Sequence, residues 1–476
     1  MIEFPPKMNQ RYDLAVIGSG PAGQKGAIAA AKLGKRVAIV DRPAALGGVC
    51  LHTGTIPSKT LREAILYLSG LRLRTFYGPD YALKRHIRIE DLRLRVDAVV
   101  AREREVVRDQ IQRNGVDFVE GWARFAGSHA LEVEREEGPP VRLEAEYILV
   151  ACGTRPARRE GIPFERHGIR DADQIWETAA GALPGSAVVI GGGVIGLEYA
   201  SMLAAAGIAT TLVDARAELL EFVDREIIGH LLDHLRQAGM VFKLGAEVTA
   251  VRGSRSEGVK VDLASGETLE AEAMLYAVGR QPNTDRLNLA AIGLPTDRRG
   301  RIEVNAQCQT RIPHIYAAGD VIGFPALASV SMEQGRVAAC HMFGRPASLP
   351  TDLLPYGIYT IPEISMVGQT EHELASAGQT YMVGLSRFDE LARAQIIGDR
   401  TGLLKIVFDP GSLRLLGVHL IGESASELVS IGQVLMSTGG TLETIRDTVF
   451  NYPTLAEAYK VAALDGLNRA RGAPRP

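Results

Sequence analysis

The stretch from Gly47 to Lys59 reads GGVCLHTGTIPSK and holds the side chains best suited to redox chemistry. Cys50 supplies a thiol, but position 55, where a second cysteine would let two sulfurs form a disulfide, is Thr55. A threonine hydroxyl can hydrogen-bond, but it cannot form a disulfide or a thiolate. Cys50 is then either a buried residue without a function or a lone thiol with a redox role of its own.

A strand, a glycine turn and a helix near the start of the chain indicate a dinucleotide-binding motif, here called the first nucleotide motif (12–41). YDLAVIGSG predicts a buried strand that enters a turn, AGQKGAIAAAKLG predicts a helix, and RVAIVD predicts a second strand that ends in an acid. The G-x-G-x-x-G spacing allows a tight turn and close approach of the backbone to a pyrophosphate at the helix N-terminus, and the acid accepts a ribose hydroxyl. The candidate residues are Gly18, Gly20, Gly23 and Asp41.

The same pattern returns in residues 186–214, here called the second nucleotide motif. It consists of SAVVIGGGVIG, LEYASMLAAAG and ATTLVD, and its candidate residues are Gly191, Gly193, Gly196 and Asp214. One such glycine pattern is weak evidence, but two complete motifs predict that the protein holds two dinucleotides. The acid favours NAD, whereas Arg216 could receive the 2′-phosphate of NADP or be an ordinary surface residue.

Other strand ends carry residues that suit a ligand site. YILVACGTRP contains Gly153 and AMLYAVGRQPNT contains Gly279, each where the chain is expected to cross between domains. HIYAAGDVIG predicts a buried strand that ends at Asp320, followed by the helix ALASVSMEQGRVAAC. Because ligands of doubly wound sheets bind at the carboxyl ends of strands, Asp320 is a further candidate. GLLKIVF and LLGVHLIG predict strands of a C-terminal domain, which begins at about 349.

Composition narrows the classes of function. The 53 Lys and Arg residues nearly balance 56 Asp and Glu residues, and both signs are interspersed, which favours a small-molecule substrate over nucleic acid or a membrane. The most charge-dense segment, 84–113, predicts a solvated amphipathic helix, with a basic docking surface as the alternative. Its apolar positions at helical spacing are Leu92, Val96, Val99, Val107 and Ile111.

The spacing of the cysteines and the length of the apolar runs indicate the cellular compartment in which the protein is found. The four cysteines are scattered without metal-ligand spacing, so we expect no metal site and a reducing compartment. Residues 1–10 have no apolar targeting core, and glycines or charges interrupt the apolar runs. We therefore expect a soluble, cytoplasmic protein.

With these motifs assembled, the chain resembles the flavoprotein disulfide reductase family, which includes lipoamide dehydrogenase, glutathione reductase and mercuric reductase. The resemblance extends over essentially the whole length. It implies an α/β fold with two Rossmann-like dinucleotide-binding domains, one for FAD and one for NAD(P), and a C-terminal α+β dimer-interface domain. The implied boundaries are 1–155 and 284–348 for FAD, 156–283 for NAD(P), and 349–476 for the interface domain.

The resemblance also implies roles for individual residues. Asp41 would bind the FAD ribose, Asp320 the ribityl chain, and the helix that begins near Leu327 would direct its positive N-terminus at the flavin pyrimidine. Further implied cofactor positions are Gly48, Ala123, Gly153, Gly279 and Ala328.

Lys59 in GTIPSK matches the family's lysine beside flavin N5, and Glu198 in GVIGLEYA matches the glutamate that pairs with it. A cation held there by a carboxylate favours negative charge that arrives on the flavin ring. The alternative is a surface lysine and an ordinary helix glutamate.

The sequence departs from the family at both parts of the disulfide machinery. The family uses a C-x4-C disulfide and a histidine of an H-P-T-x-x-E element from the other subunit. Here Thr55 replaces the second cysteine, and Tyr452 in NYPTLAEAYK replaces the histidine. A phenol with a pKa of about 10 cannot relay protons near neutral pH. Two independent losses indicate that dithiol chemistry has been abandoned.

A flavoprotein without a dithiol requires another electron acceptor, and the simplest is a second nicotinamide. GTIPSKTLREA, GDVIGFPALAS, GIYTIPEIS, ELARAQIIGD and FNYPTLAEAYKVAALDGLNR resemble the soluble (Si-specific) pyridine nucleotide transhydrogenases. That branch also has threonine in this frame and tyrosine in N-Y-P-T. The resemblance implies a cytoplasmic FAD enzyme that moves a hydride reversibly from NADPH to NAD⁺. It also implies a homodimer or larger homo-oligomer, with the Tyr452 element at the partner's flavin site.

Two other functions stay open. The chain could be an NAD(P)H dehydrogenase that reduces a quinone or a dye, or a flavin-loaded structural subunit. Lys59, Glu198 and the complete second nucleotide motif argue against a purely structural role. The sequence leaves open the direction of hydride flux, the preference between NAD and NADP, the oligomer size, and whether 157–180 is an entry flap or a linker.

Overall fold

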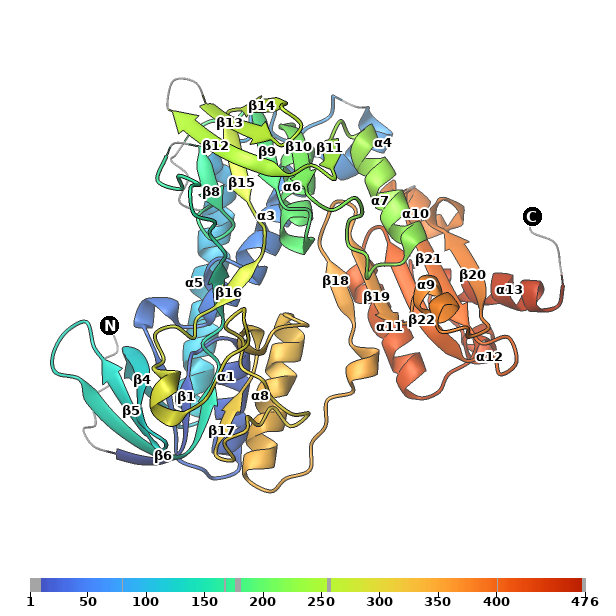
Figure 1. The fold of residues 1–476 in the computed structure, drawn as a ribbon. Coiled ribbons are helices and arrows are strands. Elements are labelled where there is room, and N and C mark those ends of the chain that lie inside the picture. Colours follow the sequence, from blue (N-terminus) through green and yellow to red (C-terminus); the bar gives the residue numbers. More distant parts are fainter. Residues whose placement is uncertain are drawn as a thin grey trace. The chain divides into compact units, whose positions relative to one another are not determined.

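The structure, a computed structural model, describes residues 10–78, 80–166, 168–175, 181–254, 258–399 and 401–472. The chain forms two compact units. Figure 1 shows their helices and strands, coloured along the sequence. Unit 1 comprises 1–61, 93–157 and 279–349, and unit 2 comprises 62–92, 158–278 and 350–476. Strands alternate with helices in both units, so the expected α/β class is confirmed. The predicted boundaries of three domains stay a prediction, since unit 2 contains both 158–278 and 350–476.

Unit 1 is built on a seven-stranded sheet of order β3-β2-β1-β6-β5-β4, with β17 paired to β6. β1, β2, β3, β6 and β17 run parallel, whereas β4 and β5 form an antiparallel extension of β6. The carboxyl ends of β1 and β6 and most of β2 are buried apolar runs, because both faces of this part of the sheet are covered. The strands are β1 (Gln10–Ile17), β2 (Val37–Asp41), β3 (Asp117–Glu120), β4 (Trp122–Gly127), β5 (Ala130–Glu134), β6 (Val141–Val150) and β17 (Ile315–Ala317).

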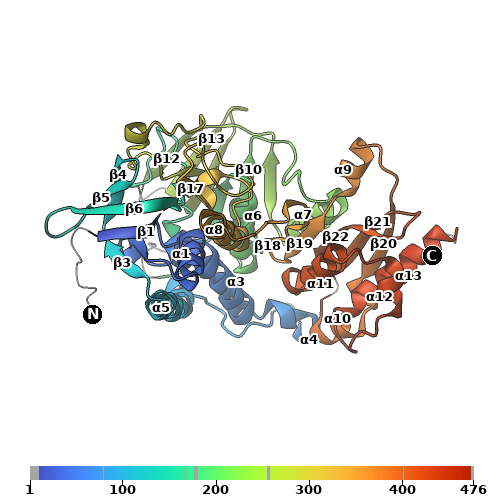
Figure 2. The same cartoon turned by 90° about the horizontal axis from the view of Figure 1, so that it is seen from below.

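Two helices of unit 1, α1 (Pro21–Lys32) and α8 (Ala328–Met342), lie side by side against this sheet (Figures 1 and 2). A Cβ atom at Gly335 of α8 would lie 2.1 Å from the carbonyl oxygen of Ala22, so only glycine permits this close approach. The helix predicted in 84–113 is confirmed as α5 (Ile89–Arg113). Its Leu92, Val96 and Ile111 side chains are buried, and many of its charged side chains face solvent.

The first part of unit 2 contains a parallel five-stranded sheet of order β11-β10-β9-β15-β8. A separate antiparallel sheet, β12-β13-β14, belongs to the same part of the chain. The elements are β8 (Ile169–Asp171), β9 (Ser186–Ile190), α6 (Val194–Ala205), β10 (Ala209–Asp214), α7 (Arg225–Gln237), β11 (Val241–Leu244), β12 (Val248–Ser254), β13 (Gly258–Leu263), β14 (Thr268–Ala271) and β15 (Ala273–Tyr276).

The C-terminal part of unit 2 is an antiparallel sheet of order β18-β19-β22-β21-β20, against which α11 and α13 pack (Figure 2). The two strands predicted in this region are confirmed as β21 and β22. The elements are β18 (Tyr356–Ile358), β19 (Ile364–Gly368), α9 (Glu371–Ser376), β20 (Met382–Arg387), α10 (Ala392–Ile397), β21 (Leu403–Phe408), β22 (Leu415–Ile421), α11 (Ala425–Ser437), α12 (Leu442–Asp447) and α13 (Glu457–Ala470).

Three further α-helices and two further strands belong to the described residues. They are α2 (Gly48–His52), α3 (Thr55–Ser69), α4 (Arg74–Tyr77), β7 (Thr154–Pro156) and β16 (Arg280–Pro282). Among the described residues, no helix combines the length and the apolar character needed to cross a bilayer.

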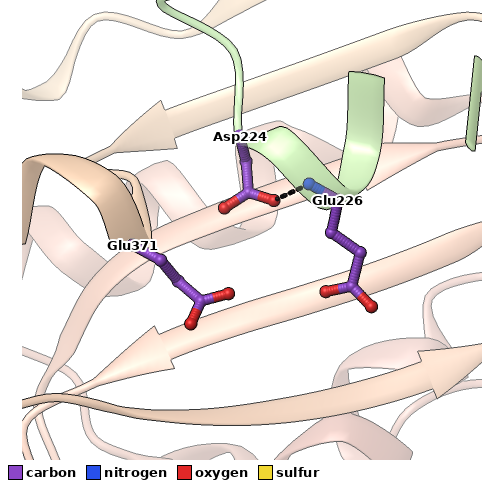
Figure 3. Close-up of side chains that lie close together, drawn as sticks. All are labelled: Asp224, Glu226 and Glu371. Carbon is purple, nitrogen blue, oxygen red and sulfur yellow. Dashed lines mark hydrogen bonds between the residues drawn. The ribbon is translucent and has the colours of Figure 1, made fainter. Parts of the chain in front are cut away.

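An ion cluster around the buried Lys405 joins α7 to the C-terminal sheet of unit 2. The carboxylates of Asp224, Glu226 and Glu371 lie near one another (Figure 3), close enough to hold a cation. The buried ammonium of Lys405 in β21 already serves as that cation: its Nζ lies 2.9 Å from Asp224 and 3.0 Å from Glu226, and it also pairs with Glu371. Asp224 also caps α7, since its side chain accepts from the Glu226 and Ile227 amides. We therefore assign this cluster a structural role.

Candidate functional site

The glycines of the first nucleotide motif are required by the backbone. Gly18 has φ 104°, and a Cβ atom there would lie 2.3 Å from the Ala151 carbonyl oxygen. A Cβ atom at Gly23 would lie 2.0 Å from the Gly18 oxygen, so larger residues cannot enter either position without a shift. Gly20 is the N-cap of α1 and has no side chain over the helix end. The turn therefore presents the free amides and positive dipole of α1, which suit a pyrophosphate.

Asp41 at the end of β2 is tied to this turn. Its Oδ2 accepts hydrogen bonds from the Ser19 amide at 2.8 Å and from the Ser19 hydroxyl at 2.6 Å. Its Oδ1 accepts from the Arg42 amide at 2.8 Å. Burial raises the pKa of Asp41, although the hydrogen bonds from Ser19 act in the opposite direction. The acid is thus fixed beside the glycine turn, as a ribose ligand would have to be.

The second nucleotide motif repeats the same backbone. Gly191 has φ 103°, a Cβ atom at Gly196 would lie 1.8 Å from the Gly191 oxygen, and Gly193 is the N-cap of α6. Asp214 at the end of β10 accepts the Gly192 amide at 2.6 Å. The structure therefore brings the predicted glycines and acid together in each motif.

Asp214 differs from Asp41 of the first nucleotide motif because the Arg216 side chain donates hydrogen bonds to its carboxylate. The guanidinium donates through Nε at 2.9 Å and through an Nη at 2.8 Å to the two carboxylate oxygens, and the Arg216 amide donates at 2.8 Å. Burial acts to raise the pKa of Asp214, but the hydrogen bonds from Arg216 and Gly192 outweigh it and lower the pKa. The Arg216 side chain is 51% exposed, so its guanidinium remains accessible to a ligand.

Asp320 lies near the carboxyl end of β17, as the sequence predicts, although the strand ends at Ala317 and Asp320 begins a short 3-10 helix. Its Oδ2 accepts from the Thr154 hydroxyl at 3.3 Å, and that hydroxyl accepts from Arg280 Nε at 2.8 Å. Burial raises the pKa of Asp320, whereas the charge of Arg280 opposes the rise. Gly153 (φ 63°) and Gly279 (φ 127°) precede β7 and β16, which pair with each other.

The remaining implied flavin positions are also located. A Cβ atom at Gly48 would lie 2.8 Å from the Cα of Gly20, so α2 packs directly on the first glycine turn. Leu327 is the N-cap of α8 and Ala328 its first residue, and no side chain caps this helix end. Ala123 is buried in β4 as part of the core, so only its backbone is available for a ligand.

Cys50, Thr55 and Lys59 come together at α2 and the start of α3. Burial raises the pKa of the Cys50 thiol, while a hydrogen bond with the Thr55 side chain and the charge of Lys59 act to lower it. A protonated thiol is a poor nucleophile and electron donor. All four cysteines of the chain lie among the described residues and are free thiols. The local chemistry is therefore that of a thiol beside a hydroxyl, without a dithiol.

Glu198 is buried on α6, and its Oε1 accepts the Tyr359 amide at 2.8 Å. Glu198 lies in unit 2 and Lys59 in unit 1, so their pairing stays a prediction. Tyr452, which precedes α13, is 66% exposed. Of the segment 157–180, residues 167 and 176–180 lie outside the described residues, and Ile169–Asp171 forms a strand of the unit 2 sheet.

Several residues that contact the candidate site residues were not predicted from the sequence. Ser19 and Gly192 occupy the variable second position of each glycine turn, where their amides reach the acid. That position could have been found by asking which amide faces the end of the next strand. Thr154 donates to Asp320, and the Tyr359 amide donates to Glu198. Both partners are distant in the sequence, so no local sequence pattern predicts these contacts.

Comparisons with known proteins agree with this geometry. The family described as pyridine nucleotide-disulphide oxidoreductase matches residues 12–335, and the dimerisation domain of that family matches residues 354–463. Members of this family depend on FAD and use NAD(P)H.

Individual relatives are similar over nearly their whole length. A protein of Mycobacterium tuberculosis (strain ATCC 25177 / H37Ra) named soluble pyridine nucleotide transhydrogenase is 51% identical, over 97% of this chain and 98% of its own. A protein of the same name from Salmonella paratyphi B is 41% identical, over 96% of this chain and 98% of its own. Among solved structures, LpdA from Mycobacterium tuberculosis has a TM-score of 0.88 at 25% identity, covering 96% of this chain and 99% of that chain.

Proposed function

We propose that this chain is an FAD-dependent NAD(P)⁺ transhydrogenase, which moves a hydride reversibly from NADPH to NAD⁺ without a redox disulfide. The chain belongs to the pyridine nucleotide-disulphide oxidoreductase family. The observation that carries this proposal is that Thr55 occupies the position where a disulfide with Cys50 would require a second sulfur, and that Cys50 is a free thiol. Bound FAD would supply the hydride acceptor, flavin N5, and a second nicotinamide would take the hydride from it. The full-length relatives named soluble pyridine nucleotide transhydrogenase support this assignment.

In this proposal the first nucleotide motif and α8 belong to the FAD-binding domain. Gly18, Gly20 and Gly23 leave room for the pyrophosphate at the α1 N-terminus, and Asp41, held by Ser19, accepts the ribose hydroxyls. Asp320 would accept from the ribityl chain, and the uncapped N-terminus of α8 would hold the pyrimidine edge, where its dipole would stabilise negative charge. Gly48, Ala123, Gly153, Gly279, Leu327 and Ala328 complete the proposed cofactor positions.

Lys59 and Glu198 are the proposed catalytic pair. The lysine supplies a positive charge near the flavin, and the buried carboxylate fixes the lysine's position. No proton relay is required, because a hydride that leaves one nicotinamide enters another. This explains why a tyrosine can stand at position 452, where a phenol cannot replace an imidazole near neutral pH.

The second nucleotide motif would bind NAD and NADP in turn. Asp214 can accept the 2′-hydroxyl of NAD, and the exposed Arg216 guanidinium can turn from Asp214 to the 2′-phosphate of NADP. The bidentate contact between these two residues supports this arrangement, because it keeps the carboxylate and the guanidinium at one place.

The match to a dimerisation domain over residues 354–463 supports a homodimer. We propose that the exposed Tyr452 element lies at the partner's flavin site and that this assembly acts in the cytoplasm. The domain boundaries predicted from the sequence (1–155 with 284–348, 156–283 and 349–476) are kept as part of the proposal.

The test is an anaerobic steady-state assay with NADPH and thio-NAD⁺. Formation of reduced thio-NAD with parallel double-reciprocal lines is expected, because one pocket would bind both nucleotides in turn. The Cys50→Ser variant should retain this activity, since no sulfur takes part. If NADPH bleaches the flavin and thio-NAD⁺ is not reduced, the proposal is wrong, and a quinone becomes the acceptor to test.

A further inference from the structure

Glu198 is held by a loop that lies more than one hundred residues later in the chain. The loop, residues 359–363, connects β18 to β19 in the C-terminal part of unit 2. The Tyr359 amide donates to Glu198 Oε1 at 2.8 Å. Since the donor is a backbone group, this hydrogen bond to the carboxylate depends on where the loop runs.

Ser201 connects the loop to the helix that carries Glu198. It lies three residues after Glu198 on α6, and its hydroxyl donates to the Glu198 carbonyl oxygen at 2.7 Å. The same hydroxyl accepts the Ile361 amide at 3.1 Å. A serine hydroxyl offers one donor and two acceptor positions, so both contacts are compatible. Ser201 is only 1% exposed, and water does not readily substitute for it.

The rest of the loop is fixed by two further buried groups. Arg62 on α3 donates through Nε to the Thr360 carbonyl oxygen at 3.0 Å. Glu363 at the end of the loop accepts the Ser424 amide at 3.0 Å and the Ser426 hydroxyl at 2.6 Å. These anchors all follow Tyr359 in the loop, and Ser201 is the one that is also hydrogen-bonded to the backbone of Glu198.

We propose that Ser201 is a positioning residue for Glu198. By holding the Ile361 amide, its hydroxyl places the Tyr359 amide where it orients the Glu198 carboxylate. The inference rests on the proposed function, in which Glu198 acts together with Lys59 at the flavin. In this way the loop from the C-terminal part of the chain sets the orientation of the Glu198 carboxylate, and the buried Ser201 hydroxyl holds that loop in place.

The main experiment compares Ser201→Ala, Glu198→Gln and the double variant as purified flavoproteins. Ser201→Ala is expected to slow flavin reduction by NADPH about tenfold at saturating NADPH, because misplacement of a catalytic group lowers the rate of the reaction more than substrate affinity. In the Glu198→Gln background the same change should have no further effect. The flavin midpoint potential should shift in the same direction in both single variants.

Rescue and control variants separate positioning from stability. Ser201→Thr keeps the hydroxyl and should restore the rate, and Ser201→Cys, with weaker hydrogen bonds, should be intermediate and serves if the alanine variant does not fold. Thr210→Val is the matched control: it removes a hydroxyl that is 2% exposed and donates to the Ile208 carbonyl oxygen at 2.8 Å. It should leave the flavin reduction rate and potential unchanged.

A readout without catalysis is amide hydrogen exchange at Tyr359 and Ile361, which should accelerate in Ser201→Ala and not in Thr210→Val. Equal losses from Ser201→Ala in the wild-type and Glu198→Gln backgrounds would overturn the inference, as would unchanged exchange at Tyr359. If Glu198→Gln itself leaves flavin reduction and potential unchanged, the proposed role of Glu198 fails, and the exchange data alone then decide whether Ser201 positions the loop.

Discussion

The two nucleotide motifs share a backbone and differ in how each holds its acid. In the first, Asp41 accepts an amide and a hydroxyl from Ser19, and burial raises its pKa. In the second, the equivalent amide comes from Gly192, no hydroxyl is present, and Arg216 holds the Asp214 carboxylate and lowers its pKa. One motif thus ends in an acid anchored to its turn by an amide and a hydroxyl, and the other in an acid anchored by an amide alone and paired with an exposed cation.

This difference fits two kinds of ligand. An acid fixed by its own turn suits a cofactor that remains bound through many turnovers. An acid with a neighbouring guanidinium suits two ligands that differ only by a phosphate, since one group or the other can make the main contact. The comparison therefore supports the proposal that the first motif retains its ligand and the second exchanges it.

The largest expected effects come from adding a methyl group to the third glycine of either motif. In Gly23→Ala and Gly196→Ala the new Cβ atom would lie 2.0 Å and 1.8 Å from a carbonyl oxygen. Overpacking of this kind costs about 1–3 kcal/mol or more, so we expect Gly23→Ala to lose FAD. Gly196→Ala should retain FAD and bind NADPH about 100-fold more weakly. Flavin absorbance and NADPH titration measure both.

The control for these variants is Gly229→Ala in α7, where the new Cβ would have no neighbour within 4 Å apart from the helix's own nearby backbone. This change should leave both ligands bound and slightly stabilise the helix. Loss of FAD from Gly196→Ala together with its retention in Gly23→Ala would reverse the assignment of the two motifs.

The next largest effect, on NADPH affinity, is expected when the Arg216 cation is removed from the second motif. Arg216→Gln is expected to weaken NADPH binding about 10-fold or more, since a hydrogen bond to a charged group contributes about 1.5–3 kcal/mol. Affinity for NADH should remain the same or improve, because Asp214 becomes free. Arg236→Gln is the matched control, as Arg236 on α7 is equally exposed at 52% and pairs with Asp233. Equal weakening of NADPH and NADH would contradict the role of Arg216.

A smaller effect is expected when the first motif is made like the second. Ser19→Gly removes the hydroxyl bond to Asp41 and should weaken FAD binding about fivefold, equivalent to about 1 kcal/mol. Dissociation of FAD in mild denaturant, followed by flavin fluorescence, measures this change. The reverse substitution, Gly192→Ser, is not equivalent, because a Cβ atom there would lie 2.3 Å from Leu219. Unchanged FAD release in Ser19→Gly would show that the hydroxyl is not part of the anchor.

The smallest effect concerns pH. The folded-state pKa of Asp214 is lowered, so its contribution to stability is present above the unfolded pKa of about 3.9 and is lost as the pH falls through the folded value. Asp214→Asn should therefore unfold at a lower temperature than wild type at pH 7, by about 1–3 °C for a partly exposed pair. The difference should narrow below about pH 4. A gap that widens on acidification would contradict the direction of this pKa shift.

Much of the fold follows from local patterns in the sequence. Both strand-turn-helix-strand motifs, helix α8 and the strands β21 and β22 carry periodicities and glycine spacings that one short window reveals. Gly18, Gly23, Gly191 and Gly196 could be predicted because no other residue fits their backbone.

Contacts between distant segments could not be predicted in this way. Lys405 lies in the apolar strand LLKIVF, and its partner Asp224 is 181 residues away. Ser201 contacts Ile361 through a hydroxyl with no sequence signature. Arg216 could be identified as a candidate from its spacing, but its bidentate contact with Asp214 depends on a rotamer that spacing does not specify.

The central claim is that a hydride enters and leaves through nicotinamides without a dithiol. The most direct measurement is anaerobic stopped-flow spectroscopy: the enzyme is first reduced with one equivalent of NADPH and then mixed with NAD⁺. The account predicts that the oxidised flavin absorbance returns at least as fast as steady-state turnover, and equally fast in Cys50→Ser. A flavin that stays reduced in the presence of NAD⁺ but is reoxidised by a disulfide or a quinone would contradict it.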